Sequence, residues 1–388
     1  MKKVYLDYSA TTPLDKRVLD DMMPYLTDVY GNANSVHSFG QEASYAVDNA
    51  RRTIAECINA KRTEVYFTSG GTEANNWAIK GIAVRYGKIS GRNHIITSAI
   101  EHPSILESVK YMSNHGFEVT YLPVNSDGII EEDVLRKAIS EKTVLVSIMT
   151  ANNEIGSIQP IKELAEIAHE YGALFHTDAV QAMSSIKADV RDTNVDLMSF
   201  SGHKIYGPKG VGVLYVKSGI KPDKFMIGGH QERTMRGGTT NVPAVVGMAS
   251  ALKYTVAEME ENNAKIRQAR DHFIDRIKSE IPHIRINGGM KNRVVGNANV
   301  TFEYIEGESL LLSLDLMGIA CSSGSACSSG SLEPSHVLMA IGVPIEIAHG
   351  SIRFSFGKDT TISDVDYVVD NLKSAVERLR LMSPLTKK

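Results

Sequence analysis

Cysteine and net charge are both scarce in this 388-residue chain, and each scarcity excludes a class of protein. The three cysteines, Cys57, Cys321 and Cys327, are too few for a disulfide framework but leave room for a reactive thiol. The net charge of −3 gives no basic footprint for nucleic acid or for an anionic membrane. We therefore expect no nucleic-acid partner and no membrane partner.

Long apolar runs are also missing. No run approaches the roughly 18 residues of a membrane span, and Asp7 comes before the apolar stretch of a signal peptide could form. We therefore expect a cytoplasmic protein. Apolar residues nevertheless make up 43% of the chain, which is enough for a full core, and 22% of charged residues is unlike a disordered chain.

Short β-rich runs alternate with helical patterns over most of the chain, and this order predicts an α/β fold with a mostly parallel sheet. The length suits two domains. We expect a large domain at residues 15–255 and a smaller α+β domain formed by residues 1–14 and 256–388, linked by a helical pattern from Val246 to about Ile281. The expected strands of the large domain are Val65–Thr68, His94–Ser98, Glu118–Leu122, Val144–Met149, Ala173–Thr177, Val195–Phe200 and Val211–Val216.

The segment Ser199–Lys204 brings a lysine to a turn between the last two of these strands. Burying an unpaired ammonium group there is costly. Lys204 is therefore expected to have a lowered pKa or a covalent partner, of which the usual one is an aldehyde cofactor such as pyridoxal 5′-phosphate. A solvated loop lysine is the alternative, and the hexapeptide alone does not exclude it.

Other strand-end loops carry groups that suit a flat, phosphorylated, nitrogen-containing ring, because ligands of parallel sheets bind at the carboxyl ends of strands. Gly71 and Thr72 open a helix after the first strand, where free N–H groups favour a phosphate, although a plain N-cap would have the same pattern. His102 precedes the helix-starting Pro103. It can stack on a ring or move protons, or it can be a structural histidine.

Carboxylate, amide and guanidinium groups complete this set. Asn153 follows the fourth strand, in a place that suits a ligand or a plain turn. Asp178 follows the fifth, and a carboxylate at that depth needs a cationic partner such as a protonated pyridine nitrogen, or else Lys204 itself without any cofactor. Gln181 lies three residues further on and can reach the same ligand. Arg353, inside a short apolar strand, suits a substrate carboxylate or a structural salt bridge.

The stretch Ser322–Ser331 is rich in serine and glycine, and this composition predicts a mobile, exposed loop over about residues 322–332. Cys327 in that loop is a candidate nucleophile. Cys321 and Cys57 lie in apolar patterns and are expected to be packed.

Together these motifs resemble the NifS/IscS family of cysteine desulfurases, within the class V aminotransferase group of fold-type I pyridoxal-phosphate enzymes. The resemblance runs over nearly the whole chain. It implies a large domain with a mostly parallel seven-stranded sheet between helices, and a smaller α+β domain. The segments that carry it are Tyr5–Pro13, Asn152–Gly156, Ser201–Lys204, Gly207–Gly210, Arg236–Thr239 and Ser322–Cys327.

The resemblance also implies a role for each site residue. Lys204 would carry the cofactor as a Schiff base, and Asp178 would pair with the pyridinium nitrogen. Gln181 would bond the ring oxygen, and His102 would stack on the ring and shuttle protons. Asn153 and Arg353 would hold the substrate. The phosphate would be held by Gly71, Thr72, Ser201 and His203, with Thr239 supplied by the partner subunit of a homodimer.

The implied reaction removes sulfur from L-cysteine, giving L-alanine and a persulfide on Cys327. The long Ser/Gly loop resembles the branch of the family whose loop reaches a scaffold protein for iron–sulfur assembly. Cys327 can then transiently ligate a cluster, while no resident metal is expected. The alternatives are a selenocysteine lyase or an aminotransferase on the same fold, and, from another class, a non-catalytic assembly scaffold. A disulfide between Cys321 and a Cys327 persulfide is a less favoured hypothesis.

Overall fold

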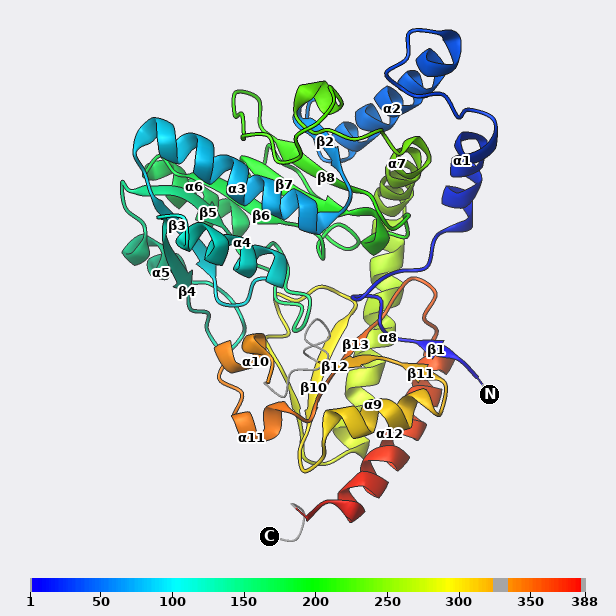
Figure 1. The fold of residues 1–388 in the computed structure, drawn as a ribbon. Coiled ribbons are helices and arrows are strands. Elements are labelled where there is room, and N and C mark those ends of the chain that lie inside the picture. The colour runs from blue at the N-terminus through cyan, green and yellow to red at the C-terminus, as the bar shows by residue number, and fades with distance from the viewer. Residues whose placement is uncertain (1, 324–333, 385–388) are drawn as a thin grey trace.

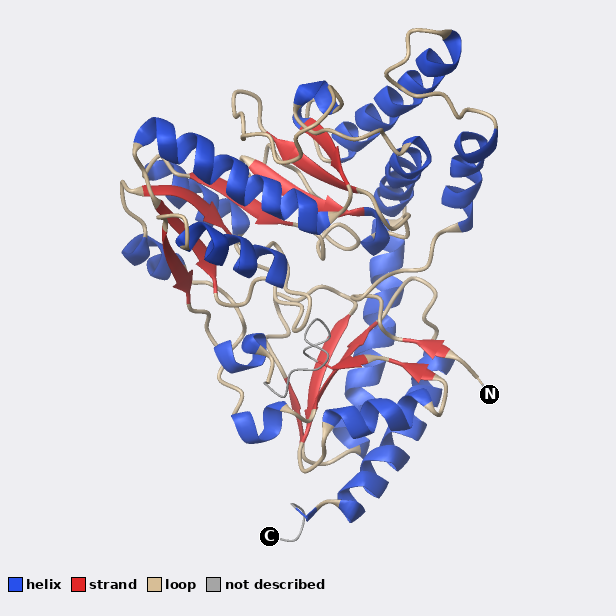
Figure 2. Ribbon diagram, in the orientation of Figure 1, coloured by secondary structure: helices blue, strands red, loops and turns tan. Residues whose placement is uncertain are grey.

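The computed structural model describes residues 2–323 and 334–384, so Cys327 lies outside the described residues. Figure 1 shows two parts: a large sheet flanked by helices above, and a smaller sheet with its own helices below. The helix α8 (Met259–Glu280) runs from the upper part into the lower one (Figures 1 and 2). The site described below lies where these two parts meet.

The large sheet has seven strands in the order β2-β8-β7-β6-β5-β3-β4. Only β8 runs antiparallel to its neighbours, and the other pairings between adjacent strands are parallel. The α/β fold with a mostly parallel seven-stranded sheet is thereby confirmed. The strands are β2 (Val65–Thr68), β3 (His94–Ser98), β4 (Glu118–Leu122), β5 (Thr143–Ser147), β6 (Leu174–Asp178), β7 (Leu197–Ser201) and β8 (Gly212–Val216).

Helices cover both faces of this sheet, which explains why its central strands are apolar on both faces. On one face α3 (Gly71–Ser90) and α4 (Pro103–Ser113) pack through Trp77, Ile82 and Ile105. The other face carries a larger core that includes Phe175 and Phe200. It is covered by α1 (Lys16–Thr27), α2 (Ser38–Cys57), α5 (Glu132–Ala138), α6 (Ile161–Glu170) and α7 (Val242–Ala257).

The smaller part has a separate core in which the tilted rings of Phe273 and Phe354 pack with centroids 4.7 Å apart. Its antiparallel sheet has the order β12-β13-β10-β9, and β1 pairs in parallel with β11. The N-terminal strand thus lies beside a strand some 300 residues later. The strands are β1 (Val4–Tyr5), β9 (Ile284–Ile286), β10 (Asn297–Phe302), β11 (Ile319–Ala320), β12 (Ser322–Ser323) and β13 (Ser351–Ser355).

The remaining helices pack against this sheet or against the edge of the large one. α9 (Gly307–Asp315) and α12 (Ile362–Met382) belong to the small core. The short helices α10 (His336–Ala340) and α11 (Ile345–Ala348) contact Ile100 and Met149 of the large part. Single 3-10 turns, η1 (Arg62–Glu64), η2 (Gly202–Lys204) and η3 (Glu232–Thr234), complete the described elements.

The sequence suggested one continuous helical pattern from Val246 to Ile281, but the structure has two helices there. α7 ends at Ala257 and α8 begins at Met259, with Glu258 between them at φ −104°, ψ 4°. Arg17 binds both carboxylate oxygens of Glu258, so an ion pair from α1 holds the break. Helical periodicity alone does not report such a long-range contact.

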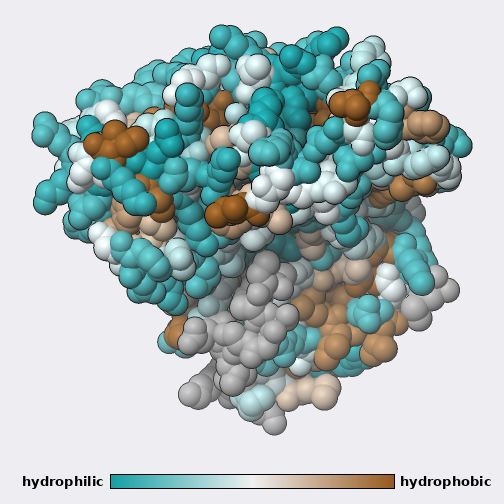
Figure 3. Space-filling model, turned by 45° about the horizontal axis from the view of Figure 1, so that its top comes forward, coloured by the Kyte–Doolittle hydropathy of each residue, from teal (hydrophilic) through white to brown (hydrophobic). Residues whose placement is uncertain are grey.

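Within residues 2–323 and 334–384, none of the helices is both apolar enough and long enough to cross a bilayer. Figure 3 shows a largely polar surface on the upper part of the visible face and a broader apolar area on the lower part.

Candidate active site

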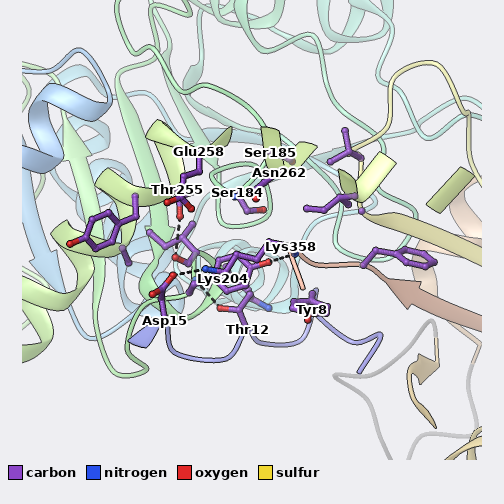
Figure 4. Close-up of a pocket in the computed structure, with 18 of the residues that line it drawn as sticks. Tyr8, Thr12, Asp15, Ser184, Ser185, Lys204, Thr255, Glu258, Asn262 and Lys358 are labelled. Atoms are coloured by element: carbon purple, nitrogen blue, oxygen red, sulfur yellow. Dashed lines mark hydrogen bonds and ion pairs between the residues drawn. The ribbon is translucent and has the colours of Figure 1, made fainter. Parts of the chain in front are cut away.

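Lys204 lies directly after the carboxyl end of β7, in the turn η2, at the junction of the two parts (Figure 4). Its Nζ donates hydrogen bonds to the backbone carbonyls of Ser9 and Ala10, the latter at 2.8 Å. The same Ser9 carbonyl accepts a bond from Gln181 Nε2 at 2.9 Å. Lys204 is therefore not a solvated loop lysine. The N-terminal segment holds it beside Gln181.

Asp178 is a buried carboxylate at the carboxyl end of β6, with 5% of its surface exposed. Asn75 Nδ2 donates to its Oδ2 at 2.7 Å, and Val180 N donates to its Oδ1 at 2.9 Å. Each hydrogen bond that Asp178 accepts in the described part of the chain thus comes from a neutral donor. A buried anion held in this way still favours a cationic partner, and a protonated ring nitrogen fits that need.

His102 is the N-cap of α4, and its Nδ1 accepts a hydrogen bond from Ser104 N at 3.1 Å. Burial lowers the pKa of His102. Asp178 opposes this shift, whereas Lys204 and His336 reinforce it. These electrostatic contacts place His102, Asp178 and Lys204 within one site. A neutral imidazole at the rim suits both ring stacking and proton transfer.

A single pocket brings together the four residues expected to hold a phosphate within one chain, namely Gly71, Thr72, Ser201 and His203. It lies at the N-terminus of the 20-residue helix α3, where backbone N–H groups and the helix dipole favour an anion. The pKa of His203 is lowered to about 4 by burial and then by Lys204 and Lys209. His203 is therefore neutral at physiological pH, and the lysines supply the positive charge.

Thr239 lies apart from these four residues. It lines a neighbouring pocket that shares only Ser69 and Gly210 with the phosphate pocket. Its segment is tied to α3 by Arg236, whose Nε and Nη2 donate to the Glu73 carboxylate at 2.8 and 3.0 Å. Because Thr239 does not line the phosphate pocket of its own chain, its expected role in the phosphate pocket of a partner subunit stays a prediction.

Arg353 is buried in β13 and forms a salt bridge with Asp7 at 2.9 Å, so the structural alternative for this residue is present. Its Nη1 donates to the backbone carbonyl of Asn153 at 3.0 Å. The buried Nε of Arg353 has no hydrogen-bond partner among the described residues. Arg353 and Asn153 are thus brought together, and one donor of the guanidinium group remains for a ligand.

The two described cysteines pack beside the hydrophobic cores, and the Cys321 thiol is also close enough to Asp7 and Arg353 for their charges to act on it. Cys57 packs beside the large core, where burial raises the pKa of its thiol to about 11. Cys321 packs beside the small core, and burial followed by the charge of Asp7 raises the pKa of its thiol. Neither forms a thiolate readily at neutral pH, so a resolving role for Cys321 is disfavoured.

Both ends of the segment that contains Cys327 are anchored near the site. Before it, Ser322 of β12 pairs with Arg353 of β13. After it, the Ser335 hydroxyl donates to Glu154, a buried carboxylate whose pKa burial raises to about 7. His336 Nε2 also bonds the backbone carbonyl of Glu101 at 3.0 Å. The anchors lie next to Arg353, Asn153 and His102.

Several of these contacts were missed by sequence reasoning. Asn75 and Ser104, which connect Asp178 with His102, lie in helices and carry no motif of their own. Ser9 and Ala10, which bind Lys204, are more than 190 residues away from it in the chain. Only the His102–Ser104 contact, two residues apart, had a local signal, because a histidine before Pro-Ser at a helix start can cap that helix.

The family model for class-V aminotransferases matches residues 4–368. Among curated proteins, the chain is 51% identical to "Cysteine desulfurase IscS" of Methanosarcina thermophila, over 100% of this chain and 95% of the relative. It is 50% identical to the protein of the same name from Dictyoglomus turgidum, over 99% and 97% of the two chains.

The chain is also similar to solved structures over nearly its whole length. A "NIFS-LIKE PROTEIN" superposes with a TM-score of 0.92 and 36% identity, over 97% of this chain and 100% of the other. "SspA in complex with cysteine" superposes with a TM-score of 0.81 and 36% identity, over 91% and 98% of the two chains.

Proposed function

Because the chain belongs to the class-V aminotransferase family, we propose that it is a pyridoxal-phosphate-dependent cysteine desulfurase, which converts L-cysteine to L-alanine and retains the sulfur. The observation that carries this proposal is the full-length identity of about one half to proteins named cysteine desulfurase. The convergence of Lys204, Asp178 and His102 at the carboxyl ends of β7, β6 and β3 supports it.

The residues present fit the cofactor. Lys204 would attach it covalently, Asp178 would pair with its protonated ring nitrogen, and Gln181 would bond its ring oxygen. The pocket at the start of α3 would take its phosphate, completed by Thr239 of the partner subunit in a homodimer. Once bound, pyridoxal phosphate supplies an electron sink that weakens the bonds at the substrate Cα.

The substrate would be held from the opposite side. The buried Nε of Arg353, which has no hydrogen-bond partner among the described residues, favours the L-cysteine carboxylate, and Asn153 lies against the same guanidinium group. His102 would then face the reacting carbon and transfer protons there. Because Asp7 already pairs with Arg353, the substrate carboxylate would share this arginine with Asp7.

Sulfur transfer assigns a role to Cys327. Its thiolate would form an S–S bond with the substrate Sγ while the substrate Cβ–S bond breaks. The bonding electrons stay with the carbon skeleton, which takes up a proton and leaves as L-alanine. The persulfide on Cys327 would then pass its outer sulfur to an acceptor, for which we propose a cytoplasmic scaffold protein for iron–sulfur assembly.

The test combines a visible spectrum of the purified enzyme with alanine and sulfide assays on L-cysteine, with and without dithiothreitol. We expect a cofactor band, and alanine equal to the sulfide released by reductant. A cofactor band with amino transfer to a keto acid, but without sulfide, would instead assign the protein to the aminotransferases. No band after addition of pyridoxal phosphate would contradict the role of Lys204.

A further inference from the structure

A continuous chain of hydrogen bonds joins Asp178 to His102 through two side chains to which no role has been assigned. Asn75 Nδ2 donates to Asp178 Oδ2 at 2.7 Å and to Ser104 Oγ at 2.9 Å. Ser104 Oγ lies 2.8 Å from His102 Nδ1. We propose that Asn75 and Ser104 are positioning residues that fix the tautomer of His102 according to the anionic state of Asp178.

Asn75 is suited to this task because it is almost fully buried, with 1% of its surface exposed, and comes from α3 between the two groups that it joins. Both of its amide N–H groups are used. Its Oδ1 is buried and has no partner in the described part of the chain. The reverse amide orientation would set that oxygen against the Asp178 carboxylate, so the charge on Asp178 selects the observed one.

Ser104 links the amide orientation of Asn75 to the tautomer of His102. Its hydroxyl oxygen accepts from Asn75, and the hydroxyl proton is therefore directed toward His102 Nδ1. The backbone N–H of Ser104 donates to the same Nδ1 at 3.1 Å. With Nδ1 serving as an acceptor, the proton of the neutral imidazole must lie on Nε2. His102 thus has an N–H group, and no free lone pair, at Nε2.

The charged and titratable groups around His102 do not make this choice. They are Asp178 of β6, Lys204 of η2 and His336 of α10, and they act on the total charge of the ring. The choice between the two ring nitrogens comes from the donors at Nδ1. This inference rests on the proposed function only in that His102 and Asp178 would act on the same cofactor.

The first experiment needs neither cofactor nor activity. Apoprotein is labelled with ¹⁵N-histidine, and the His102 signals are assigned by their loss in His102→Gln. We expect the neutral ring in the Nε2–H tautomer, with Nδ1 unprotonated. If neutral His102 were found mainly as the Nδ1–H tautomer in the wild-type protein, the proposal would be overturned, and no variant of Asn75 or Ser104 would be needed.

The second experiment uses Asn75→Ala, Ser104→Ala, the double variant, and Asn76→Ala as the matched control. Asn76 is the neighbour of Asn75 on α3, is half-buried, and its Nδ2 donates to the Thr72 carbonyl at 2.9 Å. Asn75→Ala does not touch His102, yet it should raise the Nδ1–H tautomer at least threefold, because the freed Ser104 oxygen can now accept from Nδ1. Asn76→Ala should match wild type.

The holoenzyme supplies the reciprocal measurement. Ser104→Ala does not touch Asp178, yet it should shift the apparent pKa of the visible cofactor band by half a unit or more, as should Asn75→Ala. The double variant should shift it no further than the larger single variant. Additive shifts of the apparent pKa of the cofactor band in the double variant would overturn the proposal. An unchanged His102 tautomer in Asn75→Ala would also overturn it. If the tautomer and pKa results came out as expected but the enzyme had no desulfurase activity, only the proposed function would be contradicted.

Discussion

Asp178 and His102 illustrate how single residues acquire their properties in this site. Asp178 is buried, and the hydrogen bonds to its carboxylate oxygens come from the neutral donors Asn75 and Val180. His102 is kept neutral by burial and by Lys204. Each property comes from groups on other elements, because charge and burial at one atom depend on everything packed around it.

The cysteines give a direct test at the same scale. Cys327→Ala should keep the cofactor band but lose at least 99% of sulfide release, because Cys327 is not among the residues proposed to bind the cofactor. Cys321→Ala is the matched control and should retain activity within about twofold, since burial raises the pKa of its thiol. Sulfide assays on both variants decide. Persulfide labelling that disappears only in Cys321→Ala would contradict the assignment.

Glu101 should make the stability depend on pH. Burial raises its pKa to about 8, with Asp178 acting in the same direction and the bonds from Ser98 and Met149 against it. The folded state therefore holds this proton more tightly than the unfolded state. The stabilisation is present below about pH 4.5 and is lost as the pH rises toward 8.

Glu101→Gln should remove this loss because the amide mimics the protonated carboxyl group. Between pH 6 and pH 9 the thermal midpoint of wild type should fall more steeply than that of the variant, measured on apoprotein to exclude cofactor effects. Parallel pH profiles for the two proteins would show that Glu101 does not titrate in this range.

At the scale of elements, buried ion pairs fix segments that have little core of their own. Arg51 of α2 binds Glu232 of η3 through two hydrogen bonds of 2.7 Å, and both side chains are buried. Glu232, Arg233 and Thr234 all have positive φ angles, an unfavourable conformation for these residues. The pair therefore holds a strained turn just before the Arg236–Thr239 segment.

Arg51→Met should destabilise the protein by about 3–5 kcal/mol, because Glu232 would remain buried without its partner. The double variant Arg51→Met, Glu232→Gln should recover part of this loss in denaturant unfolding. The exposed pair Arg136–Glu170 supplies the control, since Arg136→Met should have little measurable effect. Equal losses in the single and double variants would argue against charge burial as the cause.

At the scale of the whole molecule, the site is assembled from both parts of the chain. Asp178 comes from the large sheet, Lys204 from the turn that follows β7 of that sheet, Arg353 from the small sheet, and Ser9 from the N-terminal segment. The expected contribution of Thr239 would extend this to a second subunit. The domain limits at residues 15 and 255 stay a prediction.

Mixed dimers can test the role of Thr239. Lys204→Ala and Thr239→Ala homodimers should each lose most desulfurase activity, whereas a heterodimer of the two should regain up to half of wild type. One of its sites would combine an intact Lys204 with Thr239 of the other subunit, and so would be complete. No recovery in purified heterodimers carrying two different affinity tags would place Thr239 in its own subunit's site.

Local patterns determined much of this protein. The bounds of β2, β3 and β4 follow from the sequence, because short apolar runs between turn residues form buried strands. The strand-end loops likewise pointed to Lys204, Asp178 and His102, since the ends of parallel strands meet at one edge.

Tertiary structure alone decided which groups these residues contact. Asn75 and Asp178 are 103 residues apart, and Lys204 and Ser9 are 195 apart. The ion pair at the Glu258 break joins residues 241 apart, and the pairing of Arg353 with Asp7 joins residues 346 apart. Periodicity and propensity describe neighbours along the chain. Hydrogen bonds and pKa shifts depend on neighbours in space, and these exist only once the two cores have packed.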